Sequence, residues 1–289
     1  MDFDVLPKNM SDDESIDDIF ASTARRQEVL QEHLDAQPVS EITGVIYPGG
    51  LGGSGGGTSD TWTFSVCLNP WRTGEGDLKF DKIRIIQEGL SHEELRDLMD
   101  SMSSYEVIRV AAKISESCPE WDSPQGLLES VIETNVQDNE LSRKSDELKK
   151  PFFVDDPFFG KMELDRSVNW LEAKRKTGIF SRYKVCISRD GETYDGARAK
   201  NIVTSLEERM SEIRAAIQKE LFDTYNDCWE SLGQLSESQF QKRIKLESIV
   251  VDESGSSGVW FKDGGLFLGH AIEVRIDDTG EIDSAHLAG

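Results

Sequence analysis

Residues 259–274, near the C-terminus, constrain the fold most, because they combine a turn signal with two strand-like runs. The centre of this stretch, Asp263-Gly264-Gly265, supplies residues that adopt positive φ in tight hairpins. In the run after the turn, a period of two places alternate side chains on one face of a strand. These side chains are Leu266, Leu268, His270, Ile272 and Val274. The pattern predicts a hairpin in which His270 is the one polar member of an aliphatic face.

His270 has two interpretations. In the functional one it is an acid–base or ligand-contacting residue, oriented by the carboxylate of Asp263 or Glu273. Glu273 is three residues further along the strand and would point to the opposite face, and Asp263 would reach only in a suitable register. In the structural one His270 is buried, neutral and hydrogen-bonded to a backbone carbonyl. We favour the structural interpretation, in which His270→Ala costs about 2–4 kcal/mol of stability.

The same stretch resembles the C-terminal signature of an uncharacterised bacterial family, the domain of unknown function 2262 (DUF2262). The shared pattern is Asp-Gly-x-Leu-Phe-x-Gly-His-x-Ile-Glu-Val, followed by a terminal Ala-x-Leu/Ile-Ala-Gly. It is carried here by Asp263, Gly264, Leu266, Phe267, Gly269, His270, Ile272, Glu273, Val274, Ala285, Leu287, Ala288 and Gly289. A weaker match lies upstream in Asp156-Pro157-Phe158-Phe159-Gly160 and Asn169-Trp170. The resemblance therefore covers the C-terminal half of the chain.

Two positions depart from the family pattern. Leu268 stands where the family usually has Trp, and Ala271 stands where it usually has Ser. If that indole or hydroxyl binds a ligand in the family, this chain lacks the group. The resemblance implies a shared fold and brings no established reaction.

The charge of the chain is strongly acidic. Its 289 residues include 55 acidic and 32 basic side chains, a formal net charge of −23. Such a field repels phosphate backbones and anionic lipid, so we expect neither a nucleic-acid nor a membrane partner. A basic protein would be attracted instead. Acidity also keeps a protein soluble when it has no such partner, and this second interpretation stays open.

Cysteine usage and the N-terminal residues predict a cytoplasmic protein. The four cysteines are scattered and lack metal-ligand spacing: Cys67, Cys118, Cys186 and Cys228. The N-terminal residues lack the pattern of a secretory signal, and no run approaches the ~20 apolar residues that span a bilayer. His270 and His286 offer two nitrogen ligands without a third group at matching spacing. We therefore expect no metal and no cofactor.

The N-terminal half is predicted to contain a tail and one domain. Residues 1–40 read as an acidic tail followed by a helix, and residues 41–136 as an α+β domain. A capping box at Ser91 and Glu94 begins one helix, and a second is predicted over residues 127–134. The Gly-rich residues 49–57 contain G-x-G-x-x-G, but a strand-like run follows instead of a helix. They therefore predict a flexible loop rather than a phosphate site.

The C-terminal half follows a polar segment. Residues 137–151 are charged and predict a linker, or a solvated helix that acts as one. Residues 152–289 predict a second α+β domain, whose longest element is one helix from about residue 197 to residue 229, with an apolar stripe at steps of three and four residues. Ser236 and Gln239 predict a cap at the start of a short helix that follows. The expected fold class is α+β, with two small domains that each hold a mainly antiparallel sheet and packed helices.

Three function classes are compatible with these observations. The favoured one is a non-catalytic protein-interaction module, immunity-like, that binds a basic partner. The alternatives are an enzyme or a small-ligand sensor with a site around Asp263, His270 and Glu273. An enzyme requires at least two polar side chains that converge in one open pocket, so distances in the folded chain separate the classes. The sequence does not fix the oligomeric state.

Overall fold

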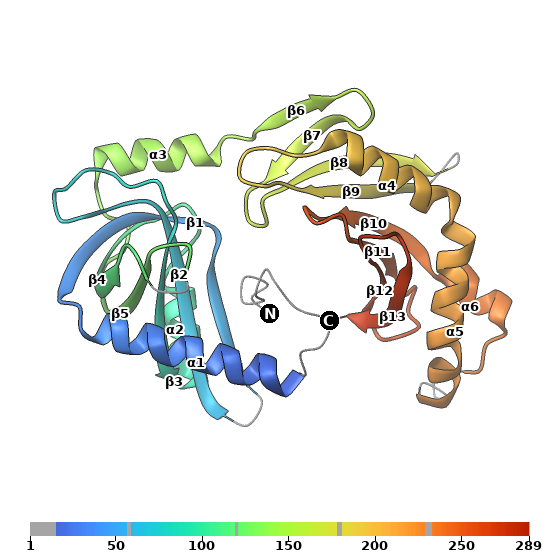
Figure 1. Cartoon of the computed structure of the whole chain (residues 1–289), viewed down its shortest axis with the longest axis horizontal. Coiled ribbons are helices and arrows are strands. Elements are labelled where there is room, and N and C mark those ends of the chain that lie inside the picture. Colours follow the sequence, from blue (N-terminus) through green and yellow to red (C-terminus); the bar gives the residue numbers. More distant parts are fainter. Residues whose placement is uncertain (1–15, 57–58, 119–120, 178–180, 229–232, 289) are drawn as a thin grey trace. The chain divides into compact units, whose positions relative to one another are not determined.

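The computed structural model describes residues 16–56, 59–118, 121–177, 181–228 and 233–288. It contains two compact units, Met1–Lys150 and Pro151–Gly289 (Figure 1). Each unit has its own sheet and its own apolar core. The predicted fold class, α+β in two domains, is therefore confirmed.

The described residues of the N-terminal unit form a closed five-stranded barrel in the order β1-β2-β3-β5-β4. The strands are β1 (Val39–Gly56), β2 (Ser59–Thr73), β3 (Ile83–Leu90), β4 (Val107–Ser115) and β5 (Gln125–Glu133). The barrel closes because β5 pairs parallel with β3 and β4 pairs antiparallel with β1. Closure leaves these strands without a free edge that another chain could extend. Inward-pointing side chains, among them Phe64, Trp71 and Val110, fill the interior.

Three helices accompany the barrel: α1 (Ile16–Asp35), α2 (His92–Asp100) and α3 (Asn139–Lys149). The helix α2 lies between β3 and β4 in the chain, begins at the predicted Ser91–Glu94 capping box, and buries Leu95 against the barrel. This strand order, with a helix after the third strand, is the arrangement of the oligonucleotide/oligosaccharide-binding fold. A fold of this kind hosts many functions and does not by itself name one.

The prediction of a flexible Gly-rich loop is wrong, because residues 49–56 form the second half of β1 and pair with β2. Close packing explains the glycines. A Cβ at Gly53 would lie 2.8 Å from Leu95 of α2, and a Cβ at Gly55 would overlap the ring of Trp62. Residue 57 lies outside the described residues. The repeated glycines thus let a helix and an indole pack directly on a strand backbone.

The predicted helix over residues 127–134 is also wrong, because this segment lies in β5. Leu128 is buried in the barrel core, and Leu127 pairs with Ile86 of β3 and Lys113 of β4. A short apolar run does not distinguish a strand from a helix by periodicity alone. The barrel can close only if a strand pairs with both β3 and β4, and this requirement overrides the local preference.

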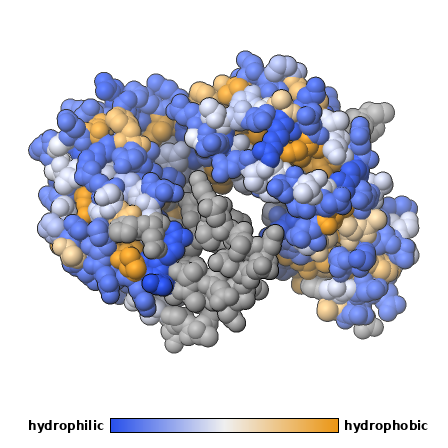
Figure 2. All heavy atoms as spheres, viewed as in Figure 1, coloured by the Kyte–Doolittle hydropathy of each residue, from blue (hydrophilic) through white to orange (hydrophobic). Residues whose placement is uncertain are grey.

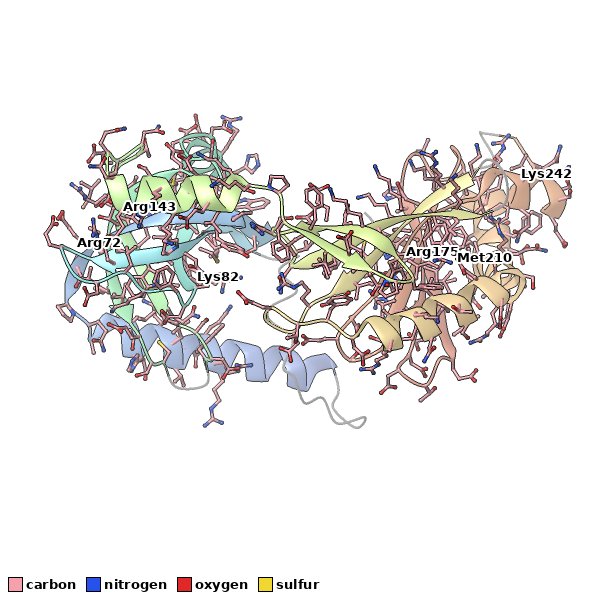
Figure 3. The ribbon with its side chains drawn as sticks, turned by 90° about the horizontal axis from the view of Figure 1, so that it is seen from above. Arg72, Lys82, Arg143, Arg175, Met210 and Lys242 are labelled. Carbon is pink, nitrogen blue, oxygen red and sulfur yellow. The ribbon has the colours of Figure 1, made fainter. Side chains whose placement is uncertain are left out.

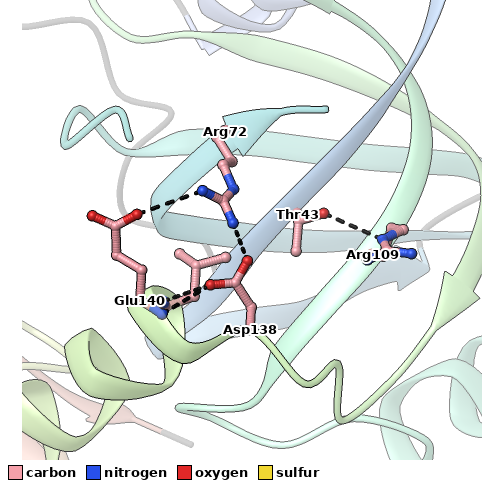
Figure 4. A network of polar contacts seen from close by, with 6 residues as sticks. Thr43, Arg72, Arg109, Asp138 and Glu140 are labelled. Atoms are coloured by element: carbon pink, nitrogen blue, oxygen red, sulfur yellow. Dashed lines mark hydrogen bonds and ion pairs between the residues drawn. The ribbon is translucent and has the colours of Figure 1, made fainter. Parts of the chain in front are cut away.

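The segment predicted as a linker holds α3. Its Leu141 is fully buried with Val45, Val107 and Val136 of the N-terminal unit. Asp138 caps the helix by accepting hydrogen bonds from the backbone N–H groups of residues 140 and 141, and it also pairs with Arg72 of β2 (Figure 4). The α3 helix is therefore held on the barrel by the apolar cluster around Leu141 and by the ion pair between its N-cap residue, Asp138, and Arg72.

The described residues of the C-terminal unit form an eight-stranded sheet in the order β13-β12-β11-β10-β9-β8-β7-β6. The strands are β6 (Phe153–Asp156), β7 (Gly160–Asp165), β8 (Trp170–Thr177), β9 (Ser181–Ser188), β10 (Lys245–Val251), β11 (Ser257–Lys262), β12 (Ala271–Ile276) and β13 (Ile282–Ala288). Neighbouring strands are antiparallel except β9 and β10, which are parallel and are joined through the helices.

Three helices, α4 (Gly196–Glu208), α5 (Met210–Cys228) and α6 (Glu237–Arg243), pack against one face of this sheet (Figure 1). The predicted single long helix is therefore wrong in its continuity, because the chain leaves the helical conformation at Arg209. The side chain of Arg209 donates hydrogen bonds to the Gly280 carbonyl and to Glu212, which holds this break. The predicted apolar stripe is buried at Ile213, Ile217, Leu221 and Tyr225.

Arg175 illustrates how charge is accommodated beside this core. Burial lowers its pKa, but hydrogen bonds to Glu207 and Tyr183 outweigh that effect and raise the pKa above the ordinary value. The guanidinium also lies 4.2 Å from the centroid of the Phe158 ring. Figure 3 labels Arg175 among the side chains of the C-terminal unit. Hydrophilic side chains dominate the visible surface of each unit, with scattered apolar groups between them (Figure 2).

A core substitution in α3 tests whether this helix belongs to the N-terminal unit. Leu141→Ala removes a fully buried side chain and is expected to lower the free energy of unfolding of that unit by about 2–5 kcal/mol. Native-state hydrogen exchange should therefore accelerate in the barrel strands and remain unchanged in residues 151–289. The matched control Leu171→Ala, in the C-terminal core, should show the reverse pattern. Unchanged exchange in the barrel of Leu141→Ala would contradict this assignment.

Candidate functional site

The predicted hairpin at residues 259–274 is wrong in its second strand. The first strand, β11, ends at Lys262, but the next strand begins only at Ala271, and residues 263–270 form a loop. Leu266 and Phe267 are both buried, whereas Leu268 has φ of 58° and is 76% exposed. His270 is also exposed. The expectation of a buried His270 on an aliphatic face is therefore wrong.

Asp263 explains why this segment forms a loop. Its carboxylate accepts hydrogen bonds from the backbone N–H groups of Gly265 (3.1 Å), Phe267 (2.7 Å) and Gly269 (3.1 Å). Burial raises the pKa of Asp263, but these three donors outweigh burial and hold the pKa below its ordinary value. The buried Phe267 ring packs edge-on against the rings of Tyr225 and Phe240. Asp263 therefore shapes and anchors the loop.

Glu273 lies in a different environment, on the face of the sheet opposite to the three helices. We call this surface the polar face. Alternation along β12 points Ile272, Val274 and Ile276 into the core and Glu273 to the polar face. The three predicted residues thus lie in different surroundings. Asp263 is buried and anchors the loop, His270 is exposed on the loop, and Glu273 lies on β12.

The polar face carries two rows of side chains that run across the strands from β8 to β13. Each residue in a row is the direct cross-strand partner of the next, so all members point the same way. The first row is Lys174, Lys184, Ser248, Trp260, Glu273 and His286. The second row is Glu172, Cys186, Val250, Gly258, Arg275 and Ser284. These rows bring residues from six strands onto one surface.

Glu273 is the most enclosed of the acidic side chains in these rows. Its side chain is 13% exposed, with one carboxylate oxygen 2.9 Å from Nε2 of His286 and 3.3 Å from Nε of Arg275. A Cβ at Gly258 would lie 2.9 Å from Nε1 of Trp260 and 3.2 Å from the other oxygen of Glu273. The glycine thus leaves room for an indole and a carboxylate above the strand.

This arrangement provides a carboxylate–imidazole pair beside an indole N–H. Such a group can hold a polar ligand by charge-assisted hydrogen bonds, or move a proton through the imidazole. Sequence reasoning included Glu273 but missed His286 and Trp260 as its neighbours, because they lie 13 residues after it and before it, respectively. Register in the sheet, and not spacing in the chain, brings these three residues together.

Cys186, in the second row, is a structural thiol. It is 4% exposed, and burial raises its pKa to about 12. A thiol in this state is a weak nucleophile, because the thiolate is the reactive form. Among the described residues, no disulfide joins the four cysteines. In the part of the chain that the structure describes, His, Cys, Asp and Glu side chains form no group of three that could hold a metal ion.

A separate cavity of about 400 Å³ opens on the N-terminal unit, beside α3. Tyr105 lines it with a φ of 72°, a strained conformation for a bulky residue. The backbone N–H of Tyr105 donates to the Ile46 carbonyl, and its carbonyl accepts a 2.5 Å hydrogen bond from the buried hydroxyl of Ser145. Both backbone groups of Tyr105 are therefore fixed, which offsets the strain.

Family models match both units. Residues 156–287 match the model of DUF2262, described as an uncharacterized protein conserved in bacteria. The predicted resemblance of the C-terminal half to this family is therefore confirmed. Residues 26–148 match a second model, DUF7021, described as a domain of unknown function. Each unit thus matches a family model whose description assigns no activity.

Curated proteins give no match to the chain. Among solved structures, a small single-stranded DNA-binding protein from Streptomyces coelicolor is similar over 34% of this chain and 92% of its own, with 6% identity and a TM-score of 0.22. A wild-type single-stranded DNA binding protein from Thermus aquaticus is similar over 55% and 79%, with 11% identity and a TM-score of 0.24. Both TM-scores are low and carry no argument, so the assignment of the barrel to the oligonucleotide/oligosaccharide-binding fold rests on its strand order alone.

Substitutions at His270 and Asp263 should differ in the size of their effect on stability. His270→Ala removes an exposed side chain and is expected to lower the free energy of unfolding by about 1 kcal/mol or less. Asp263→Ala leaves three backbone N–H groups without their acceptor and is expected to cost roughly 2–4 kcal/mol. Urea unfolding monitored by Trp fluorescence measures both. A larger loss for His270→Ala than for Asp263→Ala would contradict the loop described here.

The contribution of Asp263 should also depend on pH. Its pKa is lower in the folded chain than the ordinary value of 3.8, so its stabilisation is present above that value and is lost as pH falls through the folded-state pKa. The difference in unfolding free energy between wild type and Asp263→Asn should be constant near neutral pH and should shrink as pH falls below about 4. A difference that does not change with pH would show that the Asp263 charge plays no part.

Proposed function

We propose that this chain is a non-catalytic protein-interaction module that acts in the bacterial cytoplasm and binds a basic protein partner. An immunity-like role, in which the partner is a basic toxin that the module neutralises, is one form of this proposal. The observation that carries the proposal is the uneven distribution of charge between the units. Residues 1–150 contain 30 acidic and 14 basic side chains, whereas residues 151–289 contain 25 and 18. The N-terminal unit thus supplies most of the acidic excess.

Ion pairs in the N-terminal unit leave this imbalance unchanged, but they occupy many of the unit's cations. Several of its few cations are already paired with carboxylates of the same unit: Arg72, Lys79, Arg109, Lys113, Lys144 and Lys149. Exposed carboxylates remain around α2, and among the described residues these have no ion-pair partner. They are Glu88, Glu93, Asp97 and Asp100, which we call the α2 acidic surface. Such a surface steers a basic protein towards the barrel.

The loop at residues 263–270 further supports a non-catalytic role. A general acid or base has to reach the proton that it transfers. Asp263 instead directs its carboxylate at three backbone N–H groups of its own loop. Its depressed pKa also makes it a poor general base near neutral pH. These contacts support an anchoring role for Asp263, and they favour binding over catalysis at this loop.

The Glu273–His286 pair favours a second candidate, a small-ligand sensor or enzyme that uses the polar face. A carboxylate that orients an imidazole is a recurring arrangement in acid–base catalysis. The distance of 2.9 Å between the Glu273 carboxylate and Nε2 of His286 is within hydrogen-bond range. His286→Gln removes the imidazole and retains a hydrogen-bond donor. If the interaction module is the correct proposal, this variant should bind the basic partner as wild type does. Loss of partner binding in His286→Gln would instead place the site on the polar face.

The proposal is tested by affinity capture from a nuclease-treated bacterial lysate at low salt, with identification of bound proteins by mass spectrometry. We expect a basic protein whose association rate falls steeply as ionic strength rises. Neutralising the α2 acidic surface with E88Q, E93Q, D97N and D100N should reduce the association rate constant about tenfold at low salt.

The matched control neutralises four exposed carboxylates of the C-terminal unit, with E192Q, E208Q, E253Q and D278N. It changes the net charge equally and is expected to reduce the association rate far less. Equal losses in the two variants would mean that only the net charge matters. Capture of neutral or acidic proteins alone, or capture that requires nucleic acid, would overturn the proposal.

A further inference from the structure

One block of the polar face has the opposite sign to the rest of the protein. Lys174 and Lys176 of β8 lie directly across from Lys184 and Arg182 of β9, respectively. All four side chains are exposed and point to the same face. We call these four residues the cationic patch. They form two successive like-charged cross-strand pairs on a chain whose net charge is −23.

Folding alone does not favour this arrangement. Like charges directly opposite one another on a sheet are destabilising. Lysines often protect the edges of sheets against aggregation, and the β8–β9 ladder does extend beyond its pairings with β7 and β10, which reach only Glu172 and Lys184. Edge protection does not, however, require like charges directly opposite one another. Lys184 is 2.9 Å from Glu172, and in the part of the chain that the structure describes, the other three cations have no carboxylate within ion-pair distance. The patch therefore presents positive charge to solvent at a cost in stability.

The geometry of the patch defines the ligand that fits it. The two cation pairs are two residues apart along the strands, which corresponds to about 6.8 Å. Alternate side chains of an extended peptide have the same spacing. Carboxylates flank the patch on the same face, because Glu172 and its cross-strand partner Glu163 lie on one side and Glu273 on the other. A short anionic segment fits between them, whereas a longer polyanion would meet these carboxylates.

We propose that the cationic patch binds an acidic segment of a partner protein, in extended form, with Asp or Glu at alternate positions. Each of two carboxylates would lie over one cation pair and accept charge-assisted hydrogen bonds from it. Bound carboxylates reduce the repulsion between the cations of each pair, which makes the free energy of binding more favourable. The proposal is separate from the basic partner of the N-terminal unit, since it uses different residues, the opposite sign of charge and a different probe.

The test uses the full chain and a fluorescein-labelled peptide of alternating Glu and Thr, with fluorescence polarisation as readout. A peptide with Gln in place of Glu and an oligothymidylate of 15 nucleotides serve as comparison probes. The patch variant carries K174Q, K176Q and R182Q and retains Lys184, which pairs with Glu172. The control variant carries K219Q, K242Q and R243Q, at exposed helical positions of the same unit.

We expect saturable binding of the Glu peptide, weakened at least tenfold in the patch variant and less than twofold in the control variant. The patch variant should melt at the same temperature as wild type or higher, because it loses like-charge repulsion. Equal weakening in both variants, or equal affinity for the Gln peptide, would overturn the proposal. Tighter binding of the oligothymidylate than of the Glu peptide would assign the patch to nucleic acid, and absence of saturable binding at low salt would remove the site.

Discussion

One-sided burial of the C-terminal sheet is the constraint on which the rest of that unit depends. The helices α4, α5 and α6 cover one face, so every strand from β8 to β13 must alternate between an apolar and a polar direction. A slip of one residue in any strand would exchange the two faces. The same alternation that fills the core therefore aligns the charged residues in rows on the polar face, and the register that secures the fold also assembles the candidate sites.

The sequence predicts those parts of the fold that depend on local pattern. The capping boxes, the apolar stripe of α5 and the α+β class all follow from spacing within one element. The errors occur where distant residues decide. Gly53 lies in a strand because it pairs with Phe64, and its missing Cβ leaves room for Leu95; Leu127 lies in a strand because it pairs with β3 and β4. Neither contact is visible in the local pattern.

The candidate site shows the same limit. The sequence predicts one continuous strand over residues 266–274, but Asp263 draws three backbone N–H groups towards one carboxylate and residues 263–270 form a loop. Glu273 was identifiable as a candidate from the sequence, but its neighbours His286 and Trp260 become apparent only from the register of β11, β12 and β13. Charge is also unevenly distributed: the N-terminal unit carries most of the acidic excess, and the cationic patch lies in the C-terminal unit. We propose that these two surfaces select different protein partners.

The central claim is that this chain recognises proteins through charged surfaces and not through chemistry in the 263–270 loop. Hydrogen exchange of the full chain, with and without its captured basic partner, tests this claim most directly. The account predicts that protection on binding appears in α2 and the adjoining end of β3, with residues 263–270 unchanged. Protection confined to residues 263–270 and β12 would contradict it, and would place the functional site at the loop that Asp263 anchors.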